Sequence, residues 1–153
     1  MKLAEALILR ADLKTRAAQL RERFKANAKV QEGEAPAEDP AQLLREFEEV
    51  AAGTLVLIQQ INRTNAQTPF DGGEETLSDA LARRDVLKLR VATLRELKAA
   101  AVMAVPRMAR MEIKSFAAIN VGATQKQADD LARDLRELDT RVQGLNWTID
   151  LVE

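Results

Sequence analysis

The chain has 153 residues, the size of one domain, and a formal net charge of −1 at neutral pH. It contains no Cys, which excludes disulfides, zinc–thiolate sites and thiol catalysis. It contains no His, which removes the commonest general base and the commonest transition-metal ligand. A bound metal would therefore be a hard cation held by oxygen atoms, such as magnesium or calcium, and no other cofactor is predicted.

Charge and aromatic content also bear on the partners of the chain. A net charge of −1 gives no general attraction to nucleic acid or acidic membranes, and 3% aromatic residues leave little material for stacking bases. The apolar stretch "MKLAEALILRADL" is interrupted by Glu5 and closed by Arg10, so it is too short and too charged for a signal peptide or a membrane span. We expect a cytoplasmic protein that binds neither nucleic acid nor membrane.

The first helix is expected over residues 2–29, where the core-facing positions alternate at spacings of three and four residues. This stripe contains Leu3, Ala6, Arg10, Leu13, Ala17, Leu20, Phe24 and Asn27. The breaker "QEGEAPAEDP" ends the pattern. It also starts the next helix, because Asp39 suits an N-cap, Pro40 suits the first turn and Gln42 stands at the capping-box position.

The second helix is expected over residues 41–66 and carries two apolar stripes. The first consists of Leu43, Phe47, Val50, Thr54, Leu57 and Ile61. The second consists of Leu44, Ala51, Leu55 and Ile58, and it continues as Asn62 and Asn65. Two stripes predict a helix that is covered on more than one side.

The third helix is expected over residues 77–104, after a capping box of Thr76 and Asp79. Its stripe is Leu77, Ala80, Arg84, Leu87, Val91 and Leu94. Pro106 ends it, since proline disfavours helix at the residue before it. Apolar residues then alternate up to Val121, which favours a short β segment near residues 108–121 that needs a partner within the chain or from another subunit.

The last helix is expected over residues 124–146, with Thr124 and Gln127 as its capping box. It carries the cleanest heptad pattern in the chain: Ala128, Leu131, Leu135, Leu138, Val142, Leu145 and Ile149. These elements predict an all-α fold over a single domain, residues 1–153. Its architecture would be two long antiparallel helical hairpins in a four-helix bundle or coiled-coil-like arrangement.

Charge divides each predicted hairpin into a basic and an acidic member. Residues 1–30 hold eight Lys or Arg against three Asp or Glu, and residues 31–50 hold one against seven. Residues 77–114 and 115–153 repeat this contrast. It favours pairing of unlike helices, although the charges are equally consistent with solvated faces. The helices are long for a chain of this length, and a bundle of four would leave some apolar stripes uncovered. Self-association into a homo-oligomer is the simplest way to cover these stripes.

Polar side chains interrupt the apolar stripes at several positions. They are Arg10, Asn27, Asn62 and Arg84, with Asn65 just beyond and with Asp85 and Asp139 as candidate ion-pair partners of the arginines. The favoured interpretation is a polar layer that fixes helix register and subunit number. Alternatives are a site for a small anion such as a carboxylate or phosphate, or for a hard metal ion, and a helix that simply ends near Asn62.

The sequence gives little support for catalysis or for a nucleotide-binding motif. No glycine-rich loop matches a phosphate-binding motif, and without His no conventional triad can form. The acids and bases of "RDLRELDTR" are typical of an ion-paired helix surface. An enzyme is therefore the less favoured class. Trp147, the single Trp, is expected to be a hydrophobic plug or an anchor at an oligomer interface.

Several segments resemble a family of uncharacterised bacterial proteins sometimes labelled septicolysin. They include "INRTNAQT", "LSDALARRDVL", "EIKSFAAINV" and "LARDLRELDTRVQGLNWTIDL", and the similarity covers nearly the whole chain in order. The resemblance implies a small bacterial helical protein of unknown function, with no established catalytic residues. The label names a large, β-rich class of pore-forming toxins, and a chain with one Trp, no Cys and no long pairs of amphipathic strands argues against that activity.

From these observations we expect a helical homo-oligomer that acts by protein interaction or scaffolding. The alternative is a binding module for a small anion or a hard metal ion, built at the polar layer within the bundle.

Overall fold

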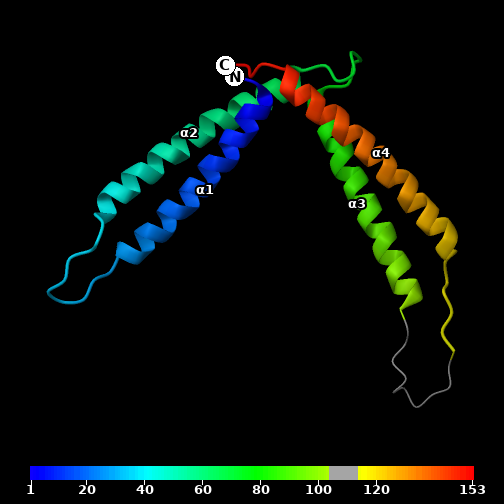
Figure 1. Ribbon diagram of the computed structural model, residues 1–153, viewed down its shortest axis with the longest axis horizontal. Helices are drawn as coiled ribbons and strands as arrows, with labels where there is room; N and C mark the ends of the chain where they lie inside the picture. Colours follow the sequence, from blue (N-terminus) through cyan, green and yellow to red (C-terminus); the bar gives the residue numbers. More distant parts are fainter. Residues whose placement is uncertain (104–113) are drawn as a thin grey trace. The chain divides into compact units, whose positions relative to one another are not determined.

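The computed structural model describes residues 1–103 and 114–153, and these residues form four helices. In chain order they are α1 (Leu3–Asn27), α2 (Pro40–Gln67), α3 (Leu77–Val102) and α4 (Val121–Thr148) (Figure 1). The contacts divide the chain into a terminal unit, Met1–Pro69 with Gln143–Glu153, and a central unit, Phe70–Val142. The all-α class is confirmed, whereas a single domain remains a prediction.

The terminal unit is built on an antiparallel hairpin of α1 and α2 (Figure 1). Leu20, Leu43 and Val50 form a buried cluster, against which Phe24 and Phe47 pack. The first predicted stripe of α2 faces this core, where Leu43, Val50, Leu57 and Ile61 are buried. The stripe of α1 also faces the core, but Arg10 within it is exposed.

The central unit pairs α3 with the part of α4 up to Val142. The predicted stripes again supply most of the buried helix residues, which are Leu77, Ala80 and Val91 of α3 and Ala128, Leu138 and Val142 of α4. Ala132 of α4 is also buried, although it lies outside the predicted stripe. At the far end of this hairpin, the Lys98 Nζ donates a hydrogen bond of 2.6 Å to Oε1 of Gln125. The periodicity of three and four residues therefore identified the core-facing side of both hairpins.

The start of α4 differs from the prediction. The helix begins at Val121, three residues before the predicted start, and the capping box of Thr124 and Gln127 is wrong. Asn120 is the N-cap instead, because its Oδ1 accepts a 2.9 Å hydrogen bond from the backbone N–H of Ala123. Thr124 lies inside the first turn and its hydroxyl donates to the Asn120 carbonyl at 2.9 Å.

The other helix starts follow their predicted caps more closely. Asp39 accepts a 3.0 Å hydrogen bond from the backbone N–H of Ala41, but Gln42 bonds to Glu46 rather than completing a capping box. The capping box of Thr76 and Asp79 is complete. The backbone N–H of Thr76 donates to the Asp79 carboxylate at 2.9 Å, and the backbone N–H of Asp79 donates to the Thr76 hydroxyl at 3.2 Å. A short polar side chain before each of α2, α3 and α4 thus satisfies a free N–H of the first turn.

The β segment expected near residues 108–121 lies partly outside the described residues, which omit 104–113. Residues 114–120 are described and form no strand, and Val121 already belongs to α4. That part of the prediction is wrong. Alternating apolar residues specify a strand only where a ladder partner exists, and here the cap at Asn120 directs the chain into a helix.

Both ends of the described chain meet within the terminal unit. The backbone N–H of Leu3 donates to the carbonyl of Ile149, and the N–H of Leu151 donates to the carbonyl of Met1, both at 2.9 Å. These bonds flank an isolated antiparallel bridge between Lys2 and Asp150. We call this pairing of residues 1–3 with residues 149–151 the terminal clasp.

Candidate functional site

An open groove runs between α1 and α2 in the terminal unit, with a volume of about 810 Å³. Its lining is mainly apolar, and the residues are Leu7, Arg10, Ala11, Lys14, Ala17, Phe47, Ala51, Thr54, Leu55 and Ile58. We call it the α1/α2 groove. Most of the lining side chains are apolar, which is typical of a surface that another apolar element covers.

The groove is lined on one side by the second apolar stripe of α2. On this stripe Leu44 is 46% exposed and Leu55 is 57% exposed, while Ala51 and Ile58 are half-buried. The first stripe of the same helix is buried against α1. The prediction of two stripes is therefore correct for the pattern, but within the described chain only one of them is covered.

The amides that continue this stripe do not form a buried layer within the terminal unit. Asn62 is exposed and Asn65 is half-buried. Arg10, the arginine of the same unit, is exposed and lines the α1/α2 groove. Among the described residues no hydrogen bond joins Arg10 to Asn62 or Asn65, so their role as a layer between subunits stays a prediction.

The other predicted polar residues do come together, in the central unit. The Arg84 guanidinium lies 3.4 Å from a carboxylate oxygen of Asp85 and 3.8 Å from one of Asp139. The Arg84 side chain is 23% exposed, whereas both acids are more open to water. This is an ion pair between α3 and α4 at the edge of the core, and two acids already satisfy the cation.

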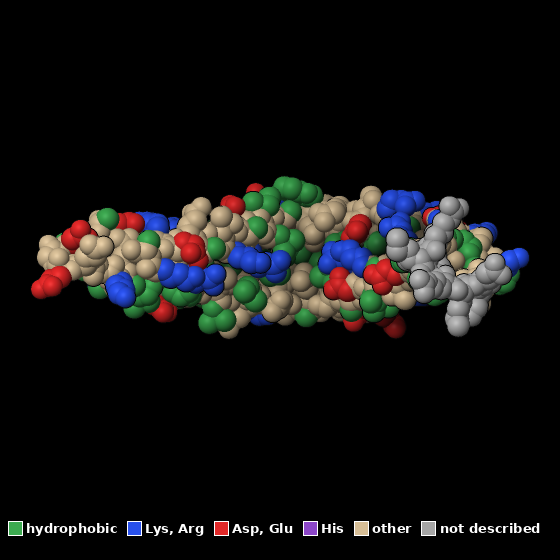
Figure 2. Space-filling model, turned by 90° about the horizontal axis from the view of Figure 1, so that it is seen from below, with side chains coloured by type: hydrophobic (Ala, Val, Ile, Leu, Met, Phe, Trp, Pro, Cys, Tyr) green, Lys and Arg blue, Asp and Glu red, His purple; other side chains and the backbone are tan. Residues whose placement is uncertain are grey.

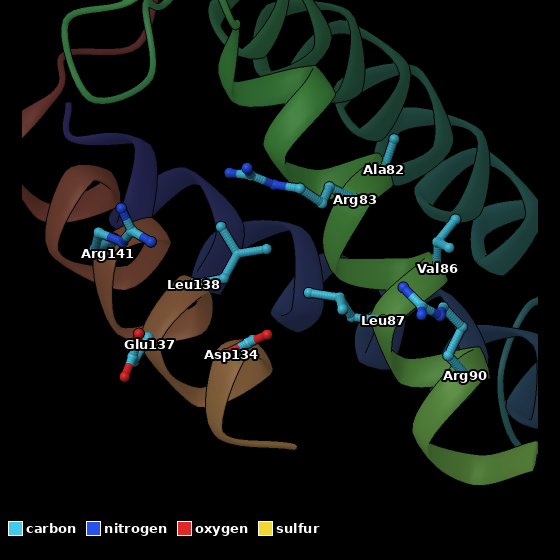
Figure 3. A pocket seen from close by; sticks show the side chains of 9 residues that line it. All are labelled: Ala82, Arg83, Val86, Leu87, Arg90, Asp134, Glu137, Leu138 and Arg141. Carbon is cyan, nitrogen blue, oxygen red and sulfur yellow. The ribbon is translucent and has the colours of Figure 1, made fainter. Parts of the chain in front are cut away.

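A second groove, of about 630 Å³, lies between α3 and α4, and we call it the α3/α4 groove. Arg83 and Arg90 reach it from α3, and Arg141 reaches it from α4 (Figure 3). Two carboxylates, Asp134 and Glu137, share its rim. The other lining residues are apolar, but charged residues make up a larger share of this groove than of the α1/α2 groove.

One end of the α3/α4 groove is organised around Phe70, which the sequence prediction missed. Phe70 is 2% exposed, and the guanidinium carbons of Arg83 and Arg141 lie 5.8 and 5.9 Å from its ring centroid. Arg83 is paired with Glu75 at 3.1 Å and Arg141 with Asp71 at 2.6 Å. The only signal in the sequence was an aromatic residue inside the Pro/Gly-rich breaker "TPFDGGEET".

Two more residues, both close to the terminal clasp, differ from the sequence prediction. Thr64 is fully buried, donates to the Gln60 carbonyl at 2.8 Å and accepts from the Val152 backbone N–H at 3.0 Å. It continues the buried stripe of α2 three residues after Ile61, which was the available signal. Trp147 is 56% exposed, so it is not a buried plug in the described chain, and its role as an interface anchor stays a prediction.

Several carboxyl groups have pKa values below their ordinary range. A hydrogen bond from Lys2 lowers the pKa of Asp150, which lies in the terminal clasp, and one from Arg23 lowers the pKa of Glu38. The pKa of Asp79 is lowered by hydrogen bonds from the hydroxyl and the backbone N–H of Thr76. These groups are cap and surface pairs, and the shifts stabilise their charged forms without marking a proton-transfer site.

The described residues include no group of three or more acidic side chains placed to hold a metal ion. None of their helices is both long and apolar enough to cross a bilayer. Figure 2 shows basic, acidic and hydrophobic side chains intermingled on the visible face, consistent with the net charge of −1.

Comparisons with known proteins relate this fold to bacterial chains of unknown role. Residues 10–151 match the model of a family described as "Family of unknown function (DUF6847)". A crystal structure of a functionally unknown conserved protein from Corynebacterium diphtheriae is similar, with 38% identity over 99% of both chains and a TM-score of 0.93. A search of the curated proteins finds no match. Neither description mentions a septicolysin.

Proposed function

We propose a role in protein interaction for this chain, which belongs to the family of unknown function DUF6847. In this proposal the protein is a cytoplasmic homo-oligomer, whose long helices present apolar faces to other copies and act as a scaffold. The observation that carries the proposal is the second stripe of α2, where Leu44 and Leu55 are each about half exposed and Leu55 lines an open groove. The septicolysin label adds no activity to it.

The energetics of exposed side chains support this assignment. Burying a leucine removes apolar surface from water and contributes roughly 1.5–3 kcal/mol, so a row of such residues left in water favours association. Val56 is 52% exposed on the same helix. Exposed apolar residues scattered singly are common on monomers, but a helical row beside an apolar groove is typical of an interface.

Native mass spectrometry of the freshly purified full chain tests the proposal. A single oligomer with a mass that is a whole multiple of the chain is expected, and Leu55→Asp should dissociate it. Leu89→Asp is the matched control, because Leu89 is equally apolar and 66% exposed but lies on α3. A wild-type chain that is monomeric at micromolar concentration would overturn the proposal.

A binding module for a small anion or hard metal ion is the second candidate. Three arginines at the α3/α4 groove favour an anion, since guanidinium groups bind carboxylates and phosphates in a bidentate geometry. Against it, Arg83 and Arg141 already pair with Glu75 and Asp71. Thermal unfolding with increasing phosphate or magnesium separates the candidates, because a specific ligand raises the melting temperature with its concentration.

A further inference from the structure

The two walls of the α1/α2 groove carry opposite charge. On α1, Lys14 lines the groove, and Arg21 shares its face because seven residues make nearly two turns. On α2, Glu48 lies three residues before Ala51 and seven before Leu55, so it belongs to the exposed stripe. Lys14, Arg21 and Glu48 lie toward one end of the groove.

The other end of the groove is mainly apolar, although Arg10 also lines it. Leu7 of α1 and Leu55 and Ile58 of α2 line it together. Because α1 and α2 are antiparallel, Lys14 stands at the level of Ala51, which lines the same groove, and Glu48 stands between the levels of Lys14 and Arg21. The surface therefore has an apolar part and a part in which a basic wall faces an acidic wall.

We infer that the α1/α2 groove is the interface with a second copy of this chain, and that the two copies are related by a two-fold axis parallel to the helices. This inference rests on the proposed homo-oligomer and specifies its geometry. A two-fold axis in this direction places α1 against α2 of the other copy at equal heights. Lys14 and Arg21 then flank Glu48 of the partner subunit, and the symmetry repeats the contact on the other side.

The charges select this axis over the other two-fold arrangement of the same faces. An axis across the helices would set α1 against α1 and α2 against α2, which brings Lys14 near the other basic wall and Glu48 near the other acidic wall. Like charges in contact oppose association, whereas unlike charges fix the register of an interface. Both axes complete a four-helix arrangement in which every neighbour is antiparallel, so the charges alone distinguish them.

The test uses charge reversal in the full chain and measures the dimer dissociation constant. Lys14→Glu turns two attractive contacts per dimer into repulsive ones, and Glu48→Lys turns four, because Glu48 faces both Lys14 and Arg21. The constant should rise on the order of tenfold for Lys14→Glu and by more for Glu48→Lys. An equimolar mixture of the two single variants should dimerise more tightly than either variant alone, because three of the four contacts become attractive again. Arg16→Glu is the matched control, because Arg16 is exposed on α1 but lines a different groove.

The outcomes separate this inference from the proposed function. If the wild type is a dimer and neither single charge reversal changes its dissociation constant, the parallel axis is overturned but the proposed homo-oligomer is not. A monomeric wild type would overturn both. If that monomer lost thermal stability with Leu55→Asp, the occupant of the groove would be another part of the same chain, which also overturns the inference.

Cross-linking gives a second measurement that does not depend on charge. The chain has no Cys, so each introduced thiol is unique. Mixed Lys14→Cys and Glu48→Cys chains should oxidise mainly to the mixed disulfide dimer, because these positions meet only between α1 and α2 of different copies. Predominant Lys14→Cys homodimers would place α1 against α1 and overturn the inference. Circular dichroism of each variant confirms that its helices are retained.

Discussion

The two hairpins use the same pattern of elements but leave different surfaces. In each, a basic helix precedes a more acidic one, and a stripe with spacings of three and four forms the core. The α1/α2 groove is apolar and open, whereas the α3/α4 groove has charged residues on its rim and Phe70 covered by two arginines at one end. Both hairpins leave apolar side chains exposed, such as Leu55 on α2 and Leu89 on α3, but only the central hairpin covers an aromatic ring with its own arginines.

The Phe70 cluster shows how a hairpin can cover an aromatic side chain with its own residues. Around Phe70, Arg83 and Arg141 cover the ring with their guanidinium faces, and Glu75 and Asp71 neutralise them. In the α1/α2 groove, Phe47 is only half-buried and Leu55 remains more than half exposed. The following changes are ordered by the size of the effect that we expect.

Phe70→Ala should have the largest effect on stability. It removes a ring that is 2% exposed and leaves a cavity beneath two arginines, which should lower the free energy of unfolding by about 3–5 kcal/mol. Urea unfolding followed by circular dichroism measures the change. Phe116→Ala serves as the control, since Phe116 is 84% exposed. Equal losses for the two variants would refute the idea that Phe70 anchors the central hairpin.

Leu57→Ala and Leu55→Ala compare the two stripes of one helix. Leu57 is 5% exposed in the core, so its truncation should lower the free energy of unfolding by about 2–4 kcal/mol. At a concentration low enough to populate monomer, Leu55→Ala should change it by less than about 0.5 kcal/mol. A large concentration-independent loss for Leu55→Ala would mean that the second stripe is covered within the monomer.

The helix caps allow a smaller comparison between the hairpins. Thr76→Ala removes the hydroxyl that accepts from the Asp79 N–H at 3.2 Å and should lower the free energy of unfolding by about 1 kcal/mol. Asp39→Ala removes a single bond to Ala41 at the start of α2 and should cost a similar amount or less. Thermal unfolding of both variants checks this order. A markedly larger loss for Asp39→Ala would contradict it.

Acid should produce the smallest and most gradual effect. The fold lowers the pKa of Asp79 from its ordinary value of 3.8, because Thr76 donates to the charged carboxylate. The resulting stability is present above the ordinary pKa and is lost as the pH falls through the lowered value. As the pH falls below the ordinary pKa of 3.8, the melting temperature of Asp79→Asn should therefore decrease less steeply than that of the wild type. Parallel curves for the two proteins would show that this carboxylate contributes nothing.

Most of the fold was predictable because helical periodicity reports directly on burial. Leu43, Val50, Leu57 and Ile61 were assigned to the core from spacing alone, and they are buried. The start of α4 was not predictable in the same way, since Asn120 and Thr124 are both good caps and only the backbone path decides between them.

The candidate site was harder to predict, because it depends on contacts between distant segments. The spacing placed Arg84 on the stripe of the third helix and named Asp139 of the last helix as a candidate partner, and the structure brings them to 3.8 Å. Phe70 was not assigned, since its partners Arg83 and Arg141 look like ordinary surface charges in the sequence. Periodicity specifies which side of a helix is apolar, but it does not say whether the same chain covers that side.

The terminal clasp has a consequence for the order in which the protein can assemble during synthesis. The central unit is one continuous segment, Phe70–Val142, whereas the terminal unit combines Met1–Pro69 with Gln143–Glu153. On the ribosome the central hairpin can close as soon as it emerges, but the hydrogen bonds of Leu3 and Thr64 wait for residues 149–152. Until those residues are translated, α1 and α2 lack their last contacts, and their apolar groove is already available to a neighbouring nascent chain.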